Sequence, residues 1–185
     1  MAEKLCKAIT LYWSGTGNTE KVAKTIHNTL VEKNIDATIM KMNPDLEVDY
    51  FDYNLVFIGA PVYENLPPKP IIRFLSNRKK KMGNVVTSAP ERLGHFATIF
   101  CTYGGGHTGV NEAIPALRYM GQFFEHVGIR VVTEWAVPGF FKQIKDQSYN
   151  TDGRFGDVTL RPDEKDLNEI KGRVTGLLQQ LKYKL

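Results

Sequence analysis

Residues 7–32 read KAITLYWSGTGNTEKVAKTIHNTLVE, and this stretch decides the fold. Its beginning, residues 7–13, is largely apolar and predicts a first strand. From Thr19 to Glu32 the apolar side chains recur at positions 22, 23, 26 and 30, which is the spacing of one helix face. A strand that leads through a short polar loop into a helix is the beginning of a βαβ unit, so we expect a parallel sheet.

The loop between this strand and this helix has the composition of a phosphate site. It consists of Ser14, Gly15, Thr16, Gly17, Asn18 and Thr19. The positive end of the helix dipole and free backbone N–H groups meet there, and the hydroxyl and amide side chains add donors. No lysine follows as in a Walker loop, and Glu20 stands where the dinucleotide fingerprint needs glycine. The loop therefore suits a terminal monophosphate; the alternative is an ordinary turn that caps the helix at Asn18 or Thr19.

The rest of the chain continues the alternation of strands and helices. Further strands are predicted at 36–42, 54–60, 95–102 and 129–137, and further helices at 68–75, 110–127 and 162–183, the last capped by Asp163. This order predicts an α/β, three-layer, doubly wound fold. Residues 138–161 have no clear period, and we expect an extended loop before the last helix within a single domain, 1–185.

Composition excludes several classes of protein. The chain has 185 residues, is 42% apolar, and carries 24 Lys and Arg against 20 Asp and Glu, a net charge of +4 that is too small to predict nucleic-acid binding. No apolar run approaches the roughly 20 residues that a membrane span needs. Cys6 and Cys101 lie far apart, which argues against a dithiol or zinc site. The N-terminus lacks the apolar core of a signal peptide, so we expect a cytoplasmic protein.

Three loops are expected to meet at one crevice, because ligands of doubly wound sheets bind at the carboxyl ends of the strands. The first is the phosphate loop. The other two begin with Ala60, Pro61, Val62, Tyr63, Glu64 and Asn65, and with Thr102, Tyr103, Gly104, Gly105, Gly106 and His107. One loop offers an aromatic face, and the other has so many glycines that a planar ligand could lie against its backbone.

The motif from Tyr12 to Glu20 resembles the phosphate loop of flavodoxins, especially the clostridial type, and the two later loops fall where that family binds the flavin ring. The resemblance implies sheet order 2-1-3-4-5, FMN as cofactor, and low-potential one-electron transfer. It also implies that the cofactor is bound by residues 14–19 of the first loop, 60–65 of the second and 102–107 of the third. Tyr63 would stack on the ring, the Glu64–Asn65 peptide would accept a hydrogen bond from reduced flavin, and the N–H groups of residues 103–106 would contact the opposite edge. The alternative for Tyr63 is a buried aromatic residue at a strand end.

The third loop departs from the clostridial pattern, which is Ser-Tyr-Gly-Trp. This chain has Thr102-Tyr103-Gly104-Gly105, so the second aromatic wall is missing and we expect one open face on the flavin, where a nicotinamide or quinone could stack. The loop itself carries His107 and no acidic residue. A charged His107 would favour an anionic reduced flavin, unless its ring turns away.

These observations favour a soluble electron carrier whose partners are redox proteins or a small-molecule acceptor. The alternative is an FMN-dependent NAD(P)H oxidoreductase that reduces a quinone or another small acceptor, with the segment WAVPGFF at 135–141 as a substrate wall or subunit contact. A third hypothesis is an FMN-binding docking module, supported by the basic run at 78–81 and the loop at 138–161. The chain could be a monomer or a homodimer.

Overall fold

The computed structural model describes residues 6–83, 91–182 and 184. Five parallel strands form one sheet in the order β2-β1-β3-β4-β5, which confirms the predicted order. The strands are β1 (Lys7–Tyr12), β2 (Asp36–Lys41), β3 (Leu55–Pro61), β4 (Phe96–Tyr103) and β5 (Arg130–Pro138). The order reverses between β1 and β3, so the crevice beyond this pair is where a doubly wound sheet binds its ligand.

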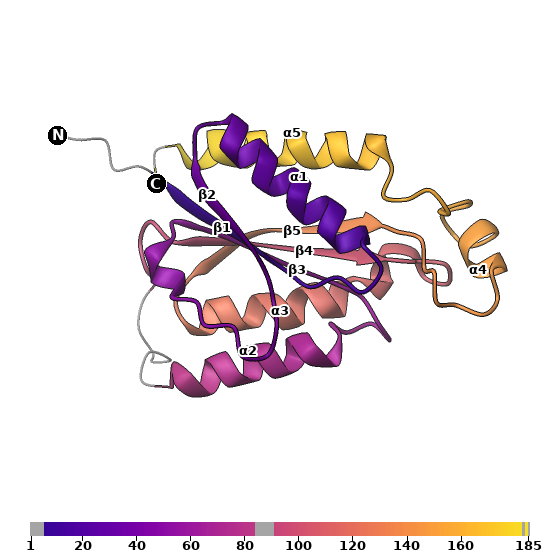
Figure 1. The fold of residues 1–185 in the computed structure, drawn as a ribbon, viewed down its shortest axis with the longest axis horizontal. Coiled ribbons are helices and arrows are strands. Elements are labelled where there is room, and N and C mark those ends of the chain that lie inside the picture. The colour runs from indigo at the N-terminus through magenta and orange to yellow at the C-terminus, as the bar shows by residue number, and fades with distance from the viewer. Residues whose placement is uncertain (1–5, 84–90, 183, 185) are drawn as a thin grey trace.

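Helices cover both faces of the sheet, as Figure 1 shows, with α1 and α5 on one face and α2 and α3 on the other. The α-helices are α1 (Asn18–Glu32), α2 (Lys69–Lys81), α3 (Ile114–His126), α4 (Ser148–Thr151) and α5 (Glu164–Leu181). Two short 3₁₀ turns, η1 (Tyr50–Asp52) and η2 (Gly109–Glu112), lie between them. The predicted three-layer, doubly wound architecture is therefore confirmed.

Each face of the sheet has its own apolar core. One cluster joins the sheet to α2 and α3, with Phe74, Phe123 and Phe124 among its large side chains. The other joins the sheet to α1 and α5 and includes Phe57 and Phe100. The central strands β3 and β4 contribute side chains to both clusters, which explains their continuous apolar sequences.

Several predicted helices differ in their bounds, and α2 continues past Leu75 to Lys81. The helix predicted at 110–127 is divided, because α3 has Pro115 in its first turn and the N–H of Ala113 bonds to Val110 in a 3₁₀ turn instead. The last helix is capped by Asp163, as predicted. The Asp163 side chain accepts a hydrogen bond from the N–H of Asp166, and the Asp166 side chain accepts one from the N–H of Asp163. Tyr183, the predicted end of that helix, lies outside the described residues.

Residues 139–161, which we call the strap, lie beyond the carboxyl ends of the strands and contain α4 (Figure 1). Asn150 is fully buried at the centre of the strap, where its amide bonds to both the N–H and the carbonyl of Phe141. These bonds give the segment an ordered fold of its own although it has no periodic pattern.

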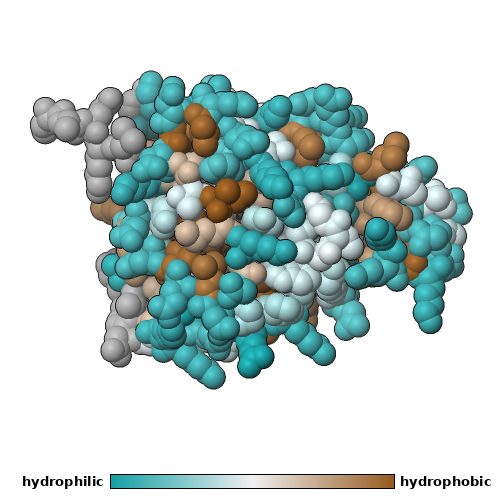
Figure 2. Space-filling view, in the orientation of Figure 1, coloured by the Kyte–Doolittle hydropathy of each residue, from teal (hydrophilic) through white to brown (hydrophobic). Residues whose placement is uncertain are grey.

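The surface is mainly polar. Figure 2 shows hydrophilic side chains over most of one face, with apolar side chains in separate patches. Among the residues that the structure describes, no helix combines the length and the apolar character of a membrane span. At the end of α2, Arg78 is buried and faces Glu47.

Candidate functional site

The loop between β1 and α1 has the geometry of an anion site. The Ser14 hydroxyl accepts a hydrogen bond from the N–H of Gly17 over 3.0 Å, and Gly17 has a left-handed φ of 100° that glycine adopts without strain. No side chain caps α1, so its first turn keeps N–H groups that can face a ligand. This donor set, with hydroxyls and no cation, fits a phosphate group.

Two predicted phosphate residues make contacts within the protein. The hydroxyls of Thr19 and Thr102 bond to each other over 2.8 Å in a buried position, which ties α1 to the end of β4. The amide nitrogen of Asn18 donates to the carbonyl of Phe140 over 2.9 Å, which ties α1 to the strap. Both contacts hold the crevice together.

The segment after β3 is a tight hairpin turn. Tyr63 and Leu66 exchange two backbone hydrogen bonds of 2.9 and 3.0 Å, and Glu64 and Asn65 between them have φ values of 51° and 64°. Two consecutive positive φ values are those of a type I′ turn. Asn65 adopts this conformation readily, whereas Glu64 does so at a cost of about 1–3 kcal/mol.

The Tyr63 ring is placed by other aromatic side chains. It meets Trp13 edge to face at 6.3 Å between ring centroids, and it is stacked near Phe141 at 6.3 Å with an angle of 22° between the planes. Its hydroxyl reaches back over Gly15, where an added Cβ would come within 2.7 Å. Partial burial raises the pKa of this hydroxyl. Tyr63 therefore forms one wall of the crevice and is not a core residue.

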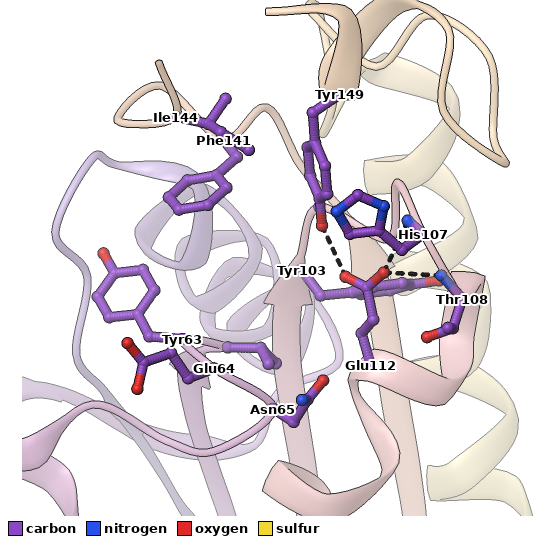
Figure 3. Close-up of a pocket in the computed structure, with 12 residues that line it drawn as sticks. Tyr63, Glu64, Asn65, Tyr103, His107, Thr108, Glu112, Phe141, Ile144 and Tyr149 are labelled. Carbon is purple, nitrogen blue, oxygen red and sulfur yellow. Dashed lines mark hydrogen bonds between the residues drawn. The ribbon is translucent and has the colours of Figure 1, made fainter. Parts of the chain in front are cut away.

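A cavity of about 360 Å³, which we call the main cavity, opens between this wall and the strap. Figure 3 shows Tyr63 and Phe141 on one side of it and Tyr149, His107 and Glu112 on the other. Its volume lies near the lower end of the roughly 300–1,000 Å³ of small-molecule sites, so it suits one ligand of cofactor size.

Glu112 is the polar centre of this cavity. Its carboxylate accepts backbone hydrogen bonds from Gly105, His107 and Thr108 over 2.9 to 3.1 Å, and a fourth from the hydroxyl of Tyr149 over 2.7 Å. Partial burial raises the pKa of the carboxyl, but these bonds lower it by more, and the resulting pKa is below its ordinary value. An ionised carboxylate therefore lies beside a loop that contains no acid in its own sequence.

The hydrogen bond between Tyr149 and Glu112 also affects the pKa of the Tyr149 hydroxyl. Burial, together with the hydrogen bond to Glu112, raises the pKa of its hydroxyl to about 12, so it stays protonated and donates. Its ring also meets the ring of His107 edge to face at 4.9 Å.

The glycine-rich loop is covered by rings from the strap. A Cβ on Gly104 or Gly106 would lie 2.6 Å from the Tyr149 ring, and a Cβ on Gly105 would lie 2.5 Å from the ring of Phe155. The face that we expected to be bare and open to a planar ligand is therefore in contact with the protein's own aromatic side chains.

A smaller cavity of about 30 Å³ lies between the phosphate loop and the main cavity, with Thr16 and Asn18 of the loop in its lining and Tyr63 shared with the main cavity. Lining one or both cavities are Thr16, Asn18, Pro61, Val62, Tyr63, Glu64, Asn65, Thr102, Tyr103, Gly104 and His107. Seven other predicted residues, all described, do not line either cavity: Ser14, Gly15, Gly17, Thr19, Ala60, Gly105 and Gly106. The three predicted loops thus form one crevice.

Five residues that line the main cavity were not predicted to bind the cofactor. Thr108 directly follows the predicted residues of the third loop. Phe141 belongs to the segment WAVPGFF, which we considered as a substrate wall. Glu112, Ile144 and Tyr149 were not identified. An acidic residue shortly after a glycine-rich loop is a signal that could have found Glu112, because such a loop exposes N–H groups that a carboxylate can accept.

Comparison with known proteins identifies the family of this chain. Residues 9–126 match the flavodoxin domain family. The flavodoxin-like domain-containing protein BilS of Clostridioides difficile (strain CD3) is 35% identical over 91 residues, which are 49% of this chain; the match spans about half the length (51%) of that relative.

Solved structures share the fold. Oxidised flavodoxin 2 from Bacillus cereus has a TM-score of 0.66 at 14% identity, with 95% of this chain and 99% of that chain covered. A flavodoxin from the domain Archaea has a TM-score of 0.60 at 19% identity, with 96% and 99% covered. With the family match over most of the chain and the five-stranded order of its sheet, this protein belongs to the flavodoxin domain family.

Proposed function

We propose that this protein binds FMN in the crevice and works as an electron carrier. The observation that carries the proposal is the order of three features along the crevice: the uncapped start of α1, the small cavity, and the aromatic main cavity, which shares lining residues with the small one. A phosphate, a flexible polar chain and a planar ring would follow one another along this path. Bound FMN would supply reversible one-electron and two-electron redox chemistry.

Different residues along the crevice would bind the phosphate and the ring of FMN. Ser14 and Thr16, with the N–H groups at the start of α1, would hold the phosphate without a full positive charge. Tyr63 would pack on the ring, and the Glu64–Asn65 peptide, exposed on its turn, would present a backbone group to the ring edge. Glu112 would keep a negative charge near the ring, which disfavours an anionic reduced form and lowers the potential.

The side chains that border the main cavity favour a carrier over a hydride-transferring enzyme. With Tyr63 and Tyr149 on different sides of the cavity, a planar ring between them would have little open face on which a nicotinamide or quinone could stack. The partner would then be a redox protein that docks near the crevice, and electrons would cross without direct contact between two stacked ligands.

Anaerobic reduction of the FMN-loaded protein tests the proposal. NADH and NADPH are added first, then dithionite in steps, while the visible spectrum is recorded. A carrier will ignore both nicotinamides and take up electrons from dithionite in two resolved steps. Direct bleaching by NADH or NADPH would instead support the oxidoreductase, and a protein that does not bind FMN at all would refute both functions.

A further inference from the structure

We propose that Tyr149 is the second aromatic wall of the flavin site and that Glu112 is the positioning residue that holds it there. The third loop lacks the tryptophan that forms this wall in clostridial-type flavodoxins, and the structure places a ring from the strap beside the same loop. The inference rests on the proposed binding of FMN, and it assigns to the strap a role in flavin binding.

The first support is position. Tyr149 lines the main cavity across from Tyr63, with open space between these two side chains (Figure 3), while its ring meets the ring of Phe141 edge to face at 6.0 Å between centroids. A ring that only plugged the site would fill that space, whereas this ring borders it. Aromatic pairs gain about 0.5–1.5 kcal/mol beyond the area that they bury, so a wall of this kind adds affinity for a planar ligand.

The second support is the way in which the ring is held. The Tyr149 hydroxyl donates to Glu112 over 2.7 Å, and the same carboxylate oxygen accepts from the N–H of Gly105 over 3.1 Å. One oxygen therefore joins the strap to the glycine-rich loop. The other oxygen accepts from His107 and Thr108, which leaves the carboxylate little freedom to move.

The third support lies in the glycines. At Gly104 and Gly106 no positive φ requires glycine, yet any Cβ would come within 2.6 Å of the Tyr149 ring. The backbone of Gly106 is also fixed to the strap, because its carbonyl accepts from the N–H of Arg154 over 2.9 Å. The glycines at these two positions thus leave room for the ring of Tyr149, which lies more than 40 residues later in the chain.

A titration of the full chain with FMN tests the assignment, with flavin fluorescence and the visible spectrum as readouts. Tyr149→Leu removes the ring, Tyr149→Phe keeps the ring and loses the hydroxyl, and Glu112→Gln removes the charge. Tyr119→Leu, at an exposed tyrosine on α3, is the matched control. Circular dichroism and the thermal midpoint of each protein without FMN establish that it folds.

We expect Tyr149→Leu to weaken FMN binding about tenfold and to make the bound flavin more fluorescent, since an adjacent tyrosine ring no longer quenches it. Tyr149→Phe and Glu112→Gln both disturb the bond between Tyr149 and Glu112, so both should fall between Tyr149→Leu and the wild type, and Tyr119→Leu should match the wild type. Unchanged affinity and fluorescence in folded Tyr149→Leu would overturn the assignment, and so would tighter binding, which would make Tyr149 a plug. If the wild type binds no FMN, the proposed function itself fails.

Discussion

Single polar side chains hold the crevice together. The side chain of Asn150 is fully buried and hydrogen-bonds to both the N–H and the carbonyl of Phe141. The hydroxyls of Thr19, at the start of α1, and Thr102, at the end of β4, hydrogen-bond to each other. A buried polar group that loses its partner costs about 1–3 kcal/mol. These residues therefore fix where Phe141 and the phosphate loop lie, although Asn150 and Thr19 do not line either cavity.

Asn150→Ala is expected to lower the free energy of unfolding by about 1–3 kcal/mol, because the N–H and the carbonyl of Phe141 lose their partner inside the strap. Urea denaturation measures the change. Gln143→Ala, at an exposed amide on the same strap, should change stability by less than about 0.5 kcal/mol. Equal losses in the two variants would show that Asn150 has no special role.

Glu112 gives the protein a defined pH dependence. The pKa of its carboxyl is lowered in the folded state, so its stabilisation is complete above the unfolded value of about 4.3 and is lost as the pH falls through the folded value. Glu112→Gln should therefore be destabilised relative to the wild type at pH 7, and the difference should shrink below about pH 4. Urea denaturation of both proteins from pH 7 to pH 3 tests this, and a difference that does not vary with pH would contradict it.

At the scale of elements, the sequence predicted the strands and helices whose apolar spacing is regular and the helix end that carries a capping residue. The strand and helix positions follow from apolar spacing, and the cap of α5 follows from Asp163. The strap could not be predicted, because single contacts between residues far apart in the sequence hold it, such as Tyr149 with Glu112 and Asn18 with Phe140. The loop composition located the crevice, but it did not reveal that the strap forms one of its sides.

The cap of α5 offers a test at this scale. Asp163→Ala should cost about 0.5–2 kcal/mol, because the N–H of Asp166 loses its acceptor at the start of an 18-residue helix. Asp163→Asn should retain most of the stability, since asparagine caps a helix about as well. The thermal midpoints of the three proteins measure the effect, and an alanine variant as stable as the wild type would show that the cap contributes nothing.

At the scale of the whole molecule, the topology assembles the site. The loops after β1, β3 and β4 are separated by tens of residues, and the parallel sheet brings their ends to one edge, where the strap closes over them (Figure 1). The site therefore exists only in the folded chain. A ligand bound there stabilises the folded state as a whole by mass action.

Thermal unfolding in the presence of FMN or of riboflavin measures this stabilisation by a bound ligand. FMN at about 100 times its dissociation constant should add about 2.7 kcal/mol to the stability. Riboflavin, which has the same ring and no phosphate, should at the same concentration give a much smaller shift, because the start of α1 then has no anion to bind. Equal shifts would mean that the loop from Ser14 to Thr19 does not recognise the phosphate.

The contact between the glycine-rich loop and Tyr149 also constrains how this protein can diverge. A side chain at position 104 and a ring at position 149 would occupy the same space, so each choice excludes the other; at position 106 the backbone oxygen of residue 149 blocks a side chain as well. Among homologues, a bulky residue at 104 should therefore occur together with a small residue at 149, and a bulky residue at 106 with a strap of different length. A loop grafted from a relative would need its own strap grafted with it.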